Sequence, residues 1–101
     1  MPFFLDLGHA NIGDGDPLAL FIQFHQRIVG MSFSNNDGLR DQHLGLHQGT
    51  IDYKKIIHAI LTKQWRGLVA FETRGKHPGS SIVELIAIYQ QVQHDNIKRA
   101  I

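Results

Sequence analysis

The chain opens on FFLDLGH, residues 3–9, a short apolar run that is interrupted by an aspartate and then by a glycine and a histidine. A run of this length with such an ending is typical of a buried β-strand. Two further runs of the same kind follow, RIVGMSFS at residues 27–34 and GLVAFE at residues 67–72. The sequence therefore predicts three short strands, each followed by polar residues.

Helical patterns separate the strands. Asp16 and Pro17 have the form of a helix start, with the aspartate as N-cap and the proline in the first position. A second helix is predicted from about residue 51 to 64, and a third begins at Ser80 or Ser81, where Ser81 and Glu84 have the spacing of a capping box. This alternation predicts an α/β fold with a parallel sheet, in a single domain that spans residues 1–101.

Composition excludes several classes of protein. The 101 residues contain no cysteine, so disulfides and thiolate metal sites are excluded and His, Asp and Glu are left as metal ligands. A formal net charge of +1 gives no broad basic field, which argues against a nucleic-acid partner. No apolar run approaches the roughly 20 residues of a membrane span, and the first residues do not resemble a signal peptide. We therefore expect a cytoplasmic protein with no membrane partner.

Two carboxylates stand at the ends of apolar strands. Asp6 closes the first predicted strand and Glu72 closes the third. In parallel βα units these ends lie on one face, where active sites are built. A buried carboxylate without a partner is costly, so the pair is predicted to meet a metal or to take part in catalysis. The structural alternative is an ion pair, for example with Arg74.

The long loop after the second strand carries Asp41 and His43. Residues two apart in an extended segment point to the same side. With His9, which follows the first strand, they provide two imidazoles and a carboxylate, a sufficient set for zinc with one open position. On its own, this loop motif favours a solvated loop, but its position after a strand on the ligand-rich face supports the metal interpretation.

Residues 74–81 join the third strand to the last helix. Arg74 and Lys76 stand there beside glycines and the free amides of a helix start. This combination predicts a cradle for an anionic group of a substrate. An ordinary helix-entry loop is the alternative.

Five segments carry a family resemblance: LDLGHAN at residues 5–11, RIVGMSFSNNDG at 27–38, RDQHL at 40–44, GTID at 49–52 and FETRG at 71–75. In this order they resemble the motifs of the xylose isomerase-like TIM barrel superfamily, also known as AP endonuclease family 2. The resemblance covers roughly residues 3 to 90. It implies that the chain is the C-terminal portion of an eight-stranded barrel, with strands six, seven and eight and their helices.

The resemblance also implies roles for the site residues. In endonuclease IV-like members, Asp6 and Glu72 would match ligands of a central metal cluster, and His9, Asp41 and His43 would match the ligands of a further zinc. In sugar isomerase and epimerase members, Asp6 and Glu72 would hold one divalent metal, which is Mn, Mg or Zn. Glu72 could also transfer a proton at the substrate carbon.

Two departures from the family pattern affect the metal site. Ser32 and Ser34 stand where the family usually has a His-x-His or His-x-Asn pattern. Serine is a poor zinc ligand beside imidazole, so the central site is weakened or lost. Strands one to five, with their ligands, have no counterpart in this sequence. A single zinc held by His9, Asp41 and His43 is therefore the favoured metal prediction.

The residues and the resemblance together predict a sugar or sugar-phosphate isomerase- or epimerase-like metal-binding barrel fragment, inactive unless other strands complete it. Its chemistry would be metal-assisted proton abstraction beside a carbonyl. Two alternatives stay open: an endonuclease IV-like zinc phosphodiesterase acting on abasic DNA, and a non-catalytic metal-binding or assembly module. Because three strands leave open sheet edges, we also expect a homo-oligomer or a second chain that completes the barrel.

Overall fold

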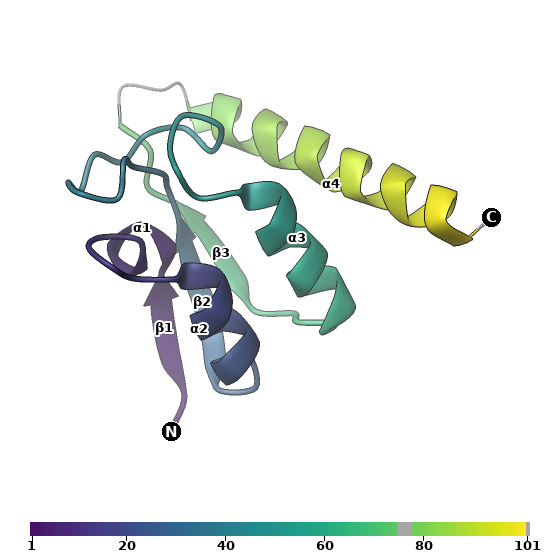
Figure 1. The fold of residues 1–101 in the computed structure, drawn as a ribbon, viewed down its shortest axis with the longest axis horizontal. Helices are drawn as coiled ribbons and strands as arrows, with labels where there is room; N and C mark the ends of the chain where they lie inside the picture. The colour runs from purple at the N-terminus through teal and green to yellow at the C-terminus, as the bar shows by residue number, and fades with distance from the viewer. Residues whose placement is uncertain (75–77, 101) are drawn as a thin grey trace.

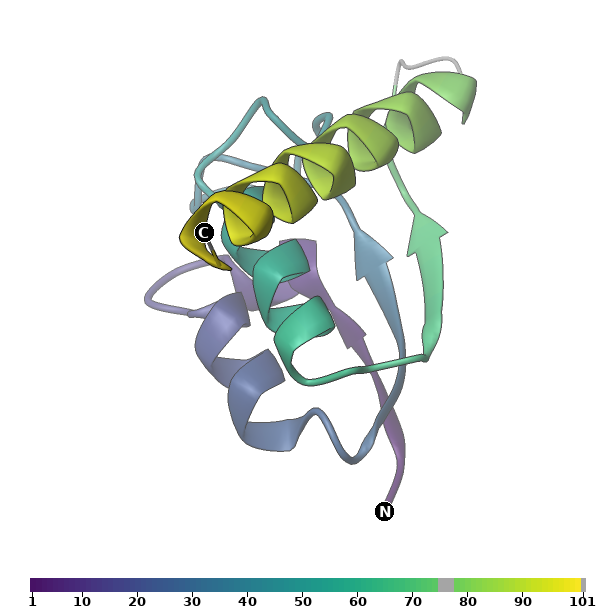
Figure 2. The same cartoon turned by 90° about the vertical axis from the view of Figure 1, so that its right-hand side faces the viewer.

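A computed structural model describes residues 1–74 and 78–100. Three parallel strands form one sheet in the order β1-β2-β3. Helices α2, α3 and α4 all lie on one side of this sheet (Figures 1 and 2). The bounds are β1 Phe3–Asp6, α1 Leu7–Ala10, α2 Pro17–Phe24, β2 Ile28–Phe33, α3 Tyr53–Thr62, β3 Leu68–Phe71 and α4 Pro78–Ala100. The α/β fold with parallel strands that the sequence predicts is confirmed.

Aspartates begin two of the helices. The side chain of Asp16 accepts a hydrogen bond from the backbone N–H of Ala19, with Pro17 in the first turn, as predicted. Asp52 caps α3 in the same way, by accepting from the N–H groups of Lys54 and Lys55. These caps fix where the chain leaves the loops at the carboxyl end of the sheet and turns back along it.

The predicted start of the last helix is wrong. Helix α4 begins at Pro78, so Ser80 and Ser81 lie inside its first turns and not at its N-cap. The Ser81 hydroxyl lies 2.8 Å from that of Thr73, and the Glu84 carboxylate accepts a hydrogen bond from the N–H of Leu46. A proline in the first turn of a helix loses no intrahelical hydrogen bond, which is why the helix can start there. The Ser81–Glu84 pair connects α4 to other segments instead of forming a capping box.

Aromatic side chains form much of the core between the sheet and the helices. Phe33 is fully buried, with its ring centroid 5.1 Å from that of Tyr53 on α3 and 6.0 Å from that of Phe71 on β3. Phe21 of α2 meets Trp65 edge-on at 5.9 Å. Apolar burial of this kind is the main favourable term in folding, so these contacts hold the helical layer on the sheet.

On the opposite face of the sheet, no helix of the described residues covers the strands. The side chain of Phe4 is 52% exposed on this face. Phe4 pairs with Gly30 in the sheet, and a Cβ atom at Gly30 would lie 2.5 Å from the Phe4 ring. The Phe4 ring therefore lies over Gly30 and fills the space that a side chain at position 30 would occupy. The strand register shifts beside this pair, between Phe3 and Phe4.

Tyr53 connects α3 to the end of β2. Its hydroxyl donates to the carbonyl of Ser34 at 2.6 Å and accepts from the N–H of Ser34 at 3.0 Å. Burial raises the pKa of the Tyr53 phenol, and the negative charge of Asp6 raises it further, against the opposing effect of the Ser34 hydrogen bond. The neutral phenol is thus the form that the folded protein holds.

We expect alkaline pH to unfold the protein partly through Tyr53. The folded-state pKa lies above the unfolded value of about 10, so the stabilisation is complete below pH 10 and is lost as the pH rises. Each pH unit above that value should lower the free energy of unfolding by about 1.4 kcal/mol through this group. Urea titrations between pH 9 and 12 would measure the slope. Tyr53→Phe should be less stable at pH 7 yet show a shallower alkaline loss, and an unchanged slope would exclude Tyr53 as its source.

Candidate metal centre

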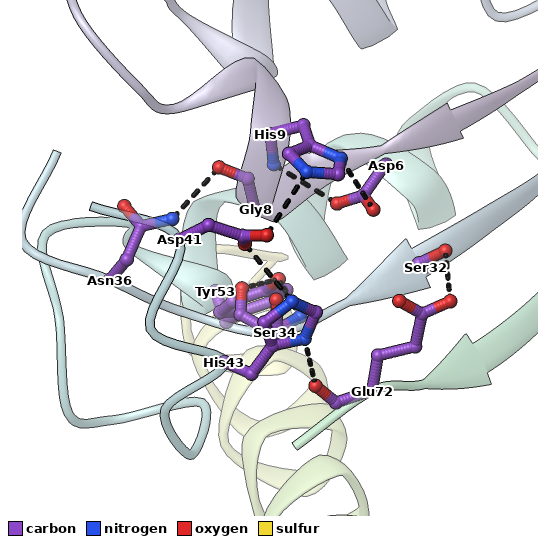
Figure 3. A network of polar contacts seen from close by, with 10 residues as sticks. All are labelled: Asp6, Gly8, His9, Ser32, Ser34, Asn36, Asp41, His43, Tyr53 and Glu72. Atoms are coloured by element: carbon purple, nitrogen blue, oxygen red, sulfur yellow. Dashed lines mark hydrogen bonds and ion pairs between the residues drawn. The ribbon is translucent and has the colours of Figure 1, made fainter. Parts of the chain in front are cut away.

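The predicted ligands lie on the face where the strands end. Asp6 is the last residue of β1, and His9 lies in the short helix α1 that follows it. Asp41 and His43 belong to the loop after β2, and Glu72 follows β3 directly. Figure 3 shows these side chains close together around the end of the sheet. The parallel topology brings them to one edge, as the sequence analysis expects.

A row of polar contacts joins three of these residues to Asp6. Nδ1 of His9 lies 3.0 Å from a carboxylate oxygen of Asp6, and its Nε2 lies 3.1 Å from Oδ2 of Asp41. The other Asp41 oxygen lies 3.1 Å from Nε2 of His43. The Asp41 carboxylate therefore stands between the Nε2 atoms of two imidazoles (Figure 3).

Asp6 also shapes the backbone that carries His9. One of its carboxylate oxygens accepts a hydrogen bond from the His9 N–H at 3.0 Å, so Asp6 is the N-cap of α1. The sequence pattern does not predict this short helix. An aspartate can end a strand and begin a helix at once, because its side chain replaces the missing acceptor of the first turn.

His43 is held by the end of β3. Its Nδ1 contacts the backbone carbonyl of Glu72, and its own carbonyl accepts from the N–H of Arg74 at 2.8 Å. Its backbone is left-handed, with φ 55°, so the extended segment assumed from the sequence is wrong at this residue. Asp41 and His43 still meet, because the side chains turn toward each other. The ring of His43 is largely buried, whereas that of His9 is 61% exposed.

The contacts of His9 and His43 depend on which of their ring nitrogens carry a hydrogen. Each nitrogen of His9 faces a carboxylate oxygen, and the nitrogens of His43 face a carboxylate and a carbonyl oxygen. An imidazole nitrogen donates only when it carries a hydrogen, so all four contacts are hydrogen bonds only if both rings are positively charged. A neutral ring leaves one nitrogen lone pair facing an oxygen.

Local interactions raise the pKa of His43 and lower the pKa of Asp41. The hydrogen bond to the Glu72 carbonyl raises the pKa of His43, with a further contribution from Asp41, while burial and Arg74 oppose the shift. Desolvation raises the pKa of Asp41, but the hydrogen bonds and charges of His43 and His9 outweigh it and lower that pKa overall. Negative charge at Asp41 and positive charge at His43 therefore stabilise each other.

The residues of the expected central site make fewer contacts. The Ser32 hydroxyl donates to Oε1 of Glu72 at 3.2 Å, whereas the carboxylate of Asp6 is used by His9. The buried hydroxyl oxygen of Ser34 has no hydrogen-bond partner among the described residues, and it lies 2.5 Å from where a Cβ of Gly8 would stand. Two carboxylates with serines in place of imidazoles are oxygen donors alone, which does not fit the nitrogen-rich set that zinc prefers.

Among residues 1–74 and 78–100, no three His, Asp or Glu side chains form a preformed group that could hold a metal ion. The donor chemistry of His9, Asp41 and His43 nevertheless fits zinc, because each contributes an atom that zinc accepts. The three side chains contact one another as they stand, so their arrangement must change for all three to share one cation.

Of the two residues predicted to bind substrate, the structure describes only Arg74. Arg74 is exposed, and its backbone N–H holds the carbonyl of His43. Lys76, and with it the centre of the predicted anion cradle, lies outside the described residues. Asn35 and Asn36 have the residue type of a turn, and no site role is predicted for them from the sequence. Two consecutive amides directly after a strand are a weak signal, and both turn out to be fully buried.

The chain is similar to known barrels in sequence and in fold. The family described as "Xylose isomerase-like TIM barrel" matches residues 1–92. A solved structure of a "D-tagatose 3-epimerase-like protein" superposes with a TM-score of 0.78 at 19% sequence identity. The superposition covers 95% of this chain and 37% of that one, which confirms the prediction of a partial barrel. No curated protein matches the chain. None of the helices in the described part is long and apolar enough to cross a membrane.

Proposed function

Because the chain belongs to the xylose isomerase-like TIM barrel family, we propose that it is the metal-binding portion of a sugar or sugar-phosphate isomerase or epimerase. In this proposal His9, Asp41 and His43 bind one divalent cation. Asp6 and Glu72 complete a reaction site only when further strands close the barrel. The chain spans 37% of the epimerase-like protein that it resembles, so catalysis is proposed for the completed barrel and not for this chain alone.

The position of Asp41 is the observation that supports cation binding. Its carboxylate faces two Nε2 atoms at 3.1 Å, while both Nδ1 atoms already face an acceptor. Metal-binding histidines typically donate one N–H to a carboxylate or carbonyl and bind the metal through the other nitrogen. Asp6 and the Glu72 carbonyl supply those acceptors here. A cation near Asp41 would take the place of the two Nε2 protons and remove the need for two charged rings.

Zinc suits this donor set better than manganese or magnesium. Two imidazoles and one carboxylate form a three-ligand set of the kind found in catalytic zinc sites, with a fourth position for water or substrate. Magnesium and manganese prefer oxygen ligands, which only Asp41 would provide among these three. We therefore propose Zn²⁺, with Mn²⁺ or Mg²⁺ as weaker occupants.

Glu72 is the proposed proton-transfer group. A bound divalent cation would polarise the carbonyl oxygen of a sugar substrate. Glu72 is exposed on the same face, with its carboxylate oriented by Ser32, and would take a proton from the carbon beside that carbonyl. Arg74 and Lys76 would hold an anionic group such as a sugar phosphate.

Metal analysis and substrate tests would decide between the candidate functions. Elemental analysis after dialysis against Zn²⁺ should find one zinc per chain, and its absence would overturn the proposal. Turnover of ketoses by the chain together with the missing strands would support the isomerase assignment. Cleavage of an abasic-site oligonucleotide would favour the zinc phosphodiesterase instead. The family match and the Asp41–His43 pair favour that second candidate, whereas Ser32 in place of a central ligand and the lack of a broad basic field oppose it.

We further infer that another polypeptide covers the free edge of β3. This strand pairs with β2 on one side only, within the described residues. Beside it, α4 exposes apolar side chains, with Val83 66% and Ile86 51% exposed. In a closed barrel a parallel strand and its helix occupy that position, and 63% of the epimerase-like structure has no counterpart here. We therefore propose βα units of the completing barrel portion as the occupant.

The purified chain should associate with itself through this same surface. Size-exclusion chromatography with light scattering at micromolar concentration should give a mass above that of one chain. The exposed substitutions Val83→Asp and Ile86→Lys should shift the mass toward the monomer without loss of helix content. Leu39→Lys, an exposed apolar site in the loop after β2, is the control that should not change the mass. A monomeric wild-type chain would contradict self-association through this surface.

A further inference from the structure

Two adjacent asparagines follow β2, and both are fully buried. The amide N–H₂ of Asn35 donates to the carbonyls of Leu46 and Ile51 at 2.7 and 3.0 Å. Its side-chain oxygen accepts from the N–H of Ile51 at 2.9 Å. Asn35, at the start of the long loop, is therefore hydrogen-bonded to residues near the end of the same loop. It makes these contacts on the side of the loop that leads into α3.

Asn36 connects the same loop to a different part of the chain. Its side-chain nitrogen donates to the carbonyl of Gly8 at 2.8 Å, as Figure 3 shows. Its side-chain oxygen accepts from the side chain of Asn11 at 2.8 Å and from the N–H of Gly38 at 2.9 Å. Gly8 and Asn11 lie on either side of His9 in the sequence. A backbone hydrogen bond from Gly13 to the Gly38 carbonyl supports the same junction.

We propose that Asn36 is a positioning residue that fixes His9 opposite Asp41. The inference rests on the proposed metal-binding function, since it assigns the residue that sets the distance between two of its ligands. His9 comes from α1, whereas Asp41 and His43 share one loop, so the three donors converge only if α1 and the loop keep a fixed separation. The His9 side chain is mostly exposed, and the contact of its ring with Asp41 cannot by itself fix the backbone.

The chemistry of the amide suits this role. Asn36 donates on one side and accepts on the other, so a single side chain satisfies groups of both segments. Both polar atoms of its side chain are engaged in these hydrogen bonds, and the side chain adds no net charge near Asp41. Buried amides of this kind are costly to leave unsatisfied, which makes the junction specific.

The test compares Asn36→Ser with Asn35→Ser, because the two positions are adjacent and equally buried. Zinc affinity is measured by competition with a chromophoric chelator, alone and in a His9→Ala background. Groups around a metal ligand typically change affinity by 10- to 100-fold, and we expect a loss of about tenfold or more for Asn36→Ser. In the His9→Ala background Asn36→Ser should cost nothing further, because it acts through His9. In the Asn35→Ser background, His9→Ala should lower zinc affinity by the same factor as it does in the wild-type chain.

A readout without metal separates this inference from the proposed function. NMR cross-peaks between the ring protons of His9 and those of His43 report whether the two rings face the same carboxylate. They should weaken in Asn36→Ser and persist in Asn35→Ser. Asn11→Ala, which removes one of the bonds to Asn36 from a less buried position, should weaken them to a smaller extent and serves if Asn36→Ser does not fold. Unchanged cross-peaks, or an additive loss with His9→Ala, would overturn the inference. Wild-type protein that shows the cross-peaks but binds no zinc would overturn only the metal proposal.

Discussion

Replacing His43 by alanine is expected to lower the zinc affinity of the chain by on the order of 100-fold or more, because partners outside the ligand shell alone account for about 10- to 100-fold. His43 is the most buried donor of the proposed set, with its side chain 12% exposed against 36% for Asp41 and 61% for His9. Its Nδ1 is committed to the Glu72 carbonyl, which leaves Nε2 facing Asp41. Removing the ring removes a ligand and frees Asp41 from one side. Chelator competition on the purified variant measures the effect.

His58→Ala is the matched control for this experiment. His58 lies on α3, and it is not part of the row of contacts formed by His9, Asp41 and His43. Its removal should leave zinc affinity unchanged, whereas His9→Ala should lower it. Equal losses at all three histidines would indicate nonspecific binding of zinc to imidazoles and would refute the site.

Replacing Phe33 by alanine is expected to cost about 3–5 kcal/mol of folding free energy. The side chain is fully buried between the rings of Tyr53 and Phe71, so its removal leaves a cavity that these rigid neighbours cannot fill. Small domains have only about 5–15 kcal/mol of total stability, so the variant should be close to unfolding at room temperature. Urea titration followed by circular dichroism measures the loss.

Phe4→Ala tests the same residue type on the other face of the sheet. Its ring is about half exposed, so less apolar area is lost and we expect a cost of about 1 kcal/mol. The difference between the stability losses of Phe33→Ala and Phe4→Ala shows which face of the sheet packs against the core. Similar costs at both positions would mean that the open face is covered in solution or that the helical layer is misplaced.

Much of the fold follows from local signals in the sequence. The strands are short apolar runs with polar endings, and the caps at Asp16 and Asp52 are visible as aspartates before helical patterns. The convergence of Asp6, His9 and Glu72 on one face follows from the parallel order of the units. These features depend on residue type and spacing, so a single sequence is sufficient to find them.

The remaining features depend on contacts between distant segments. The left-handed backbone of His43 is held by the end of β3, about 30 residues away in the chain, and no local pattern predicts it. The capping-box spacing of Ser81 and Glu84 predicts a later start for α4 than the structure has, because their side chains bind Thr73 and Leu46 instead. Asn36 looks like a turn residue until its bonds to Gly8 and Asn11 are seen.

The Phe4 ring above Gly30 has a consequence for how relatives of this chain should vary. The Phe4 ring occupies the space that a side chain at position 30 would need. A larger residue at position 30 therefore requires a smaller residue at position 4. Aligned sequences should therefore show covariation at these sites, with glycine or alanine at position 4 wherever a branched residue occupies position 30. The exchange Phe4→Gly with Gly30→Val should be tolerated better than Gly30→Val alone.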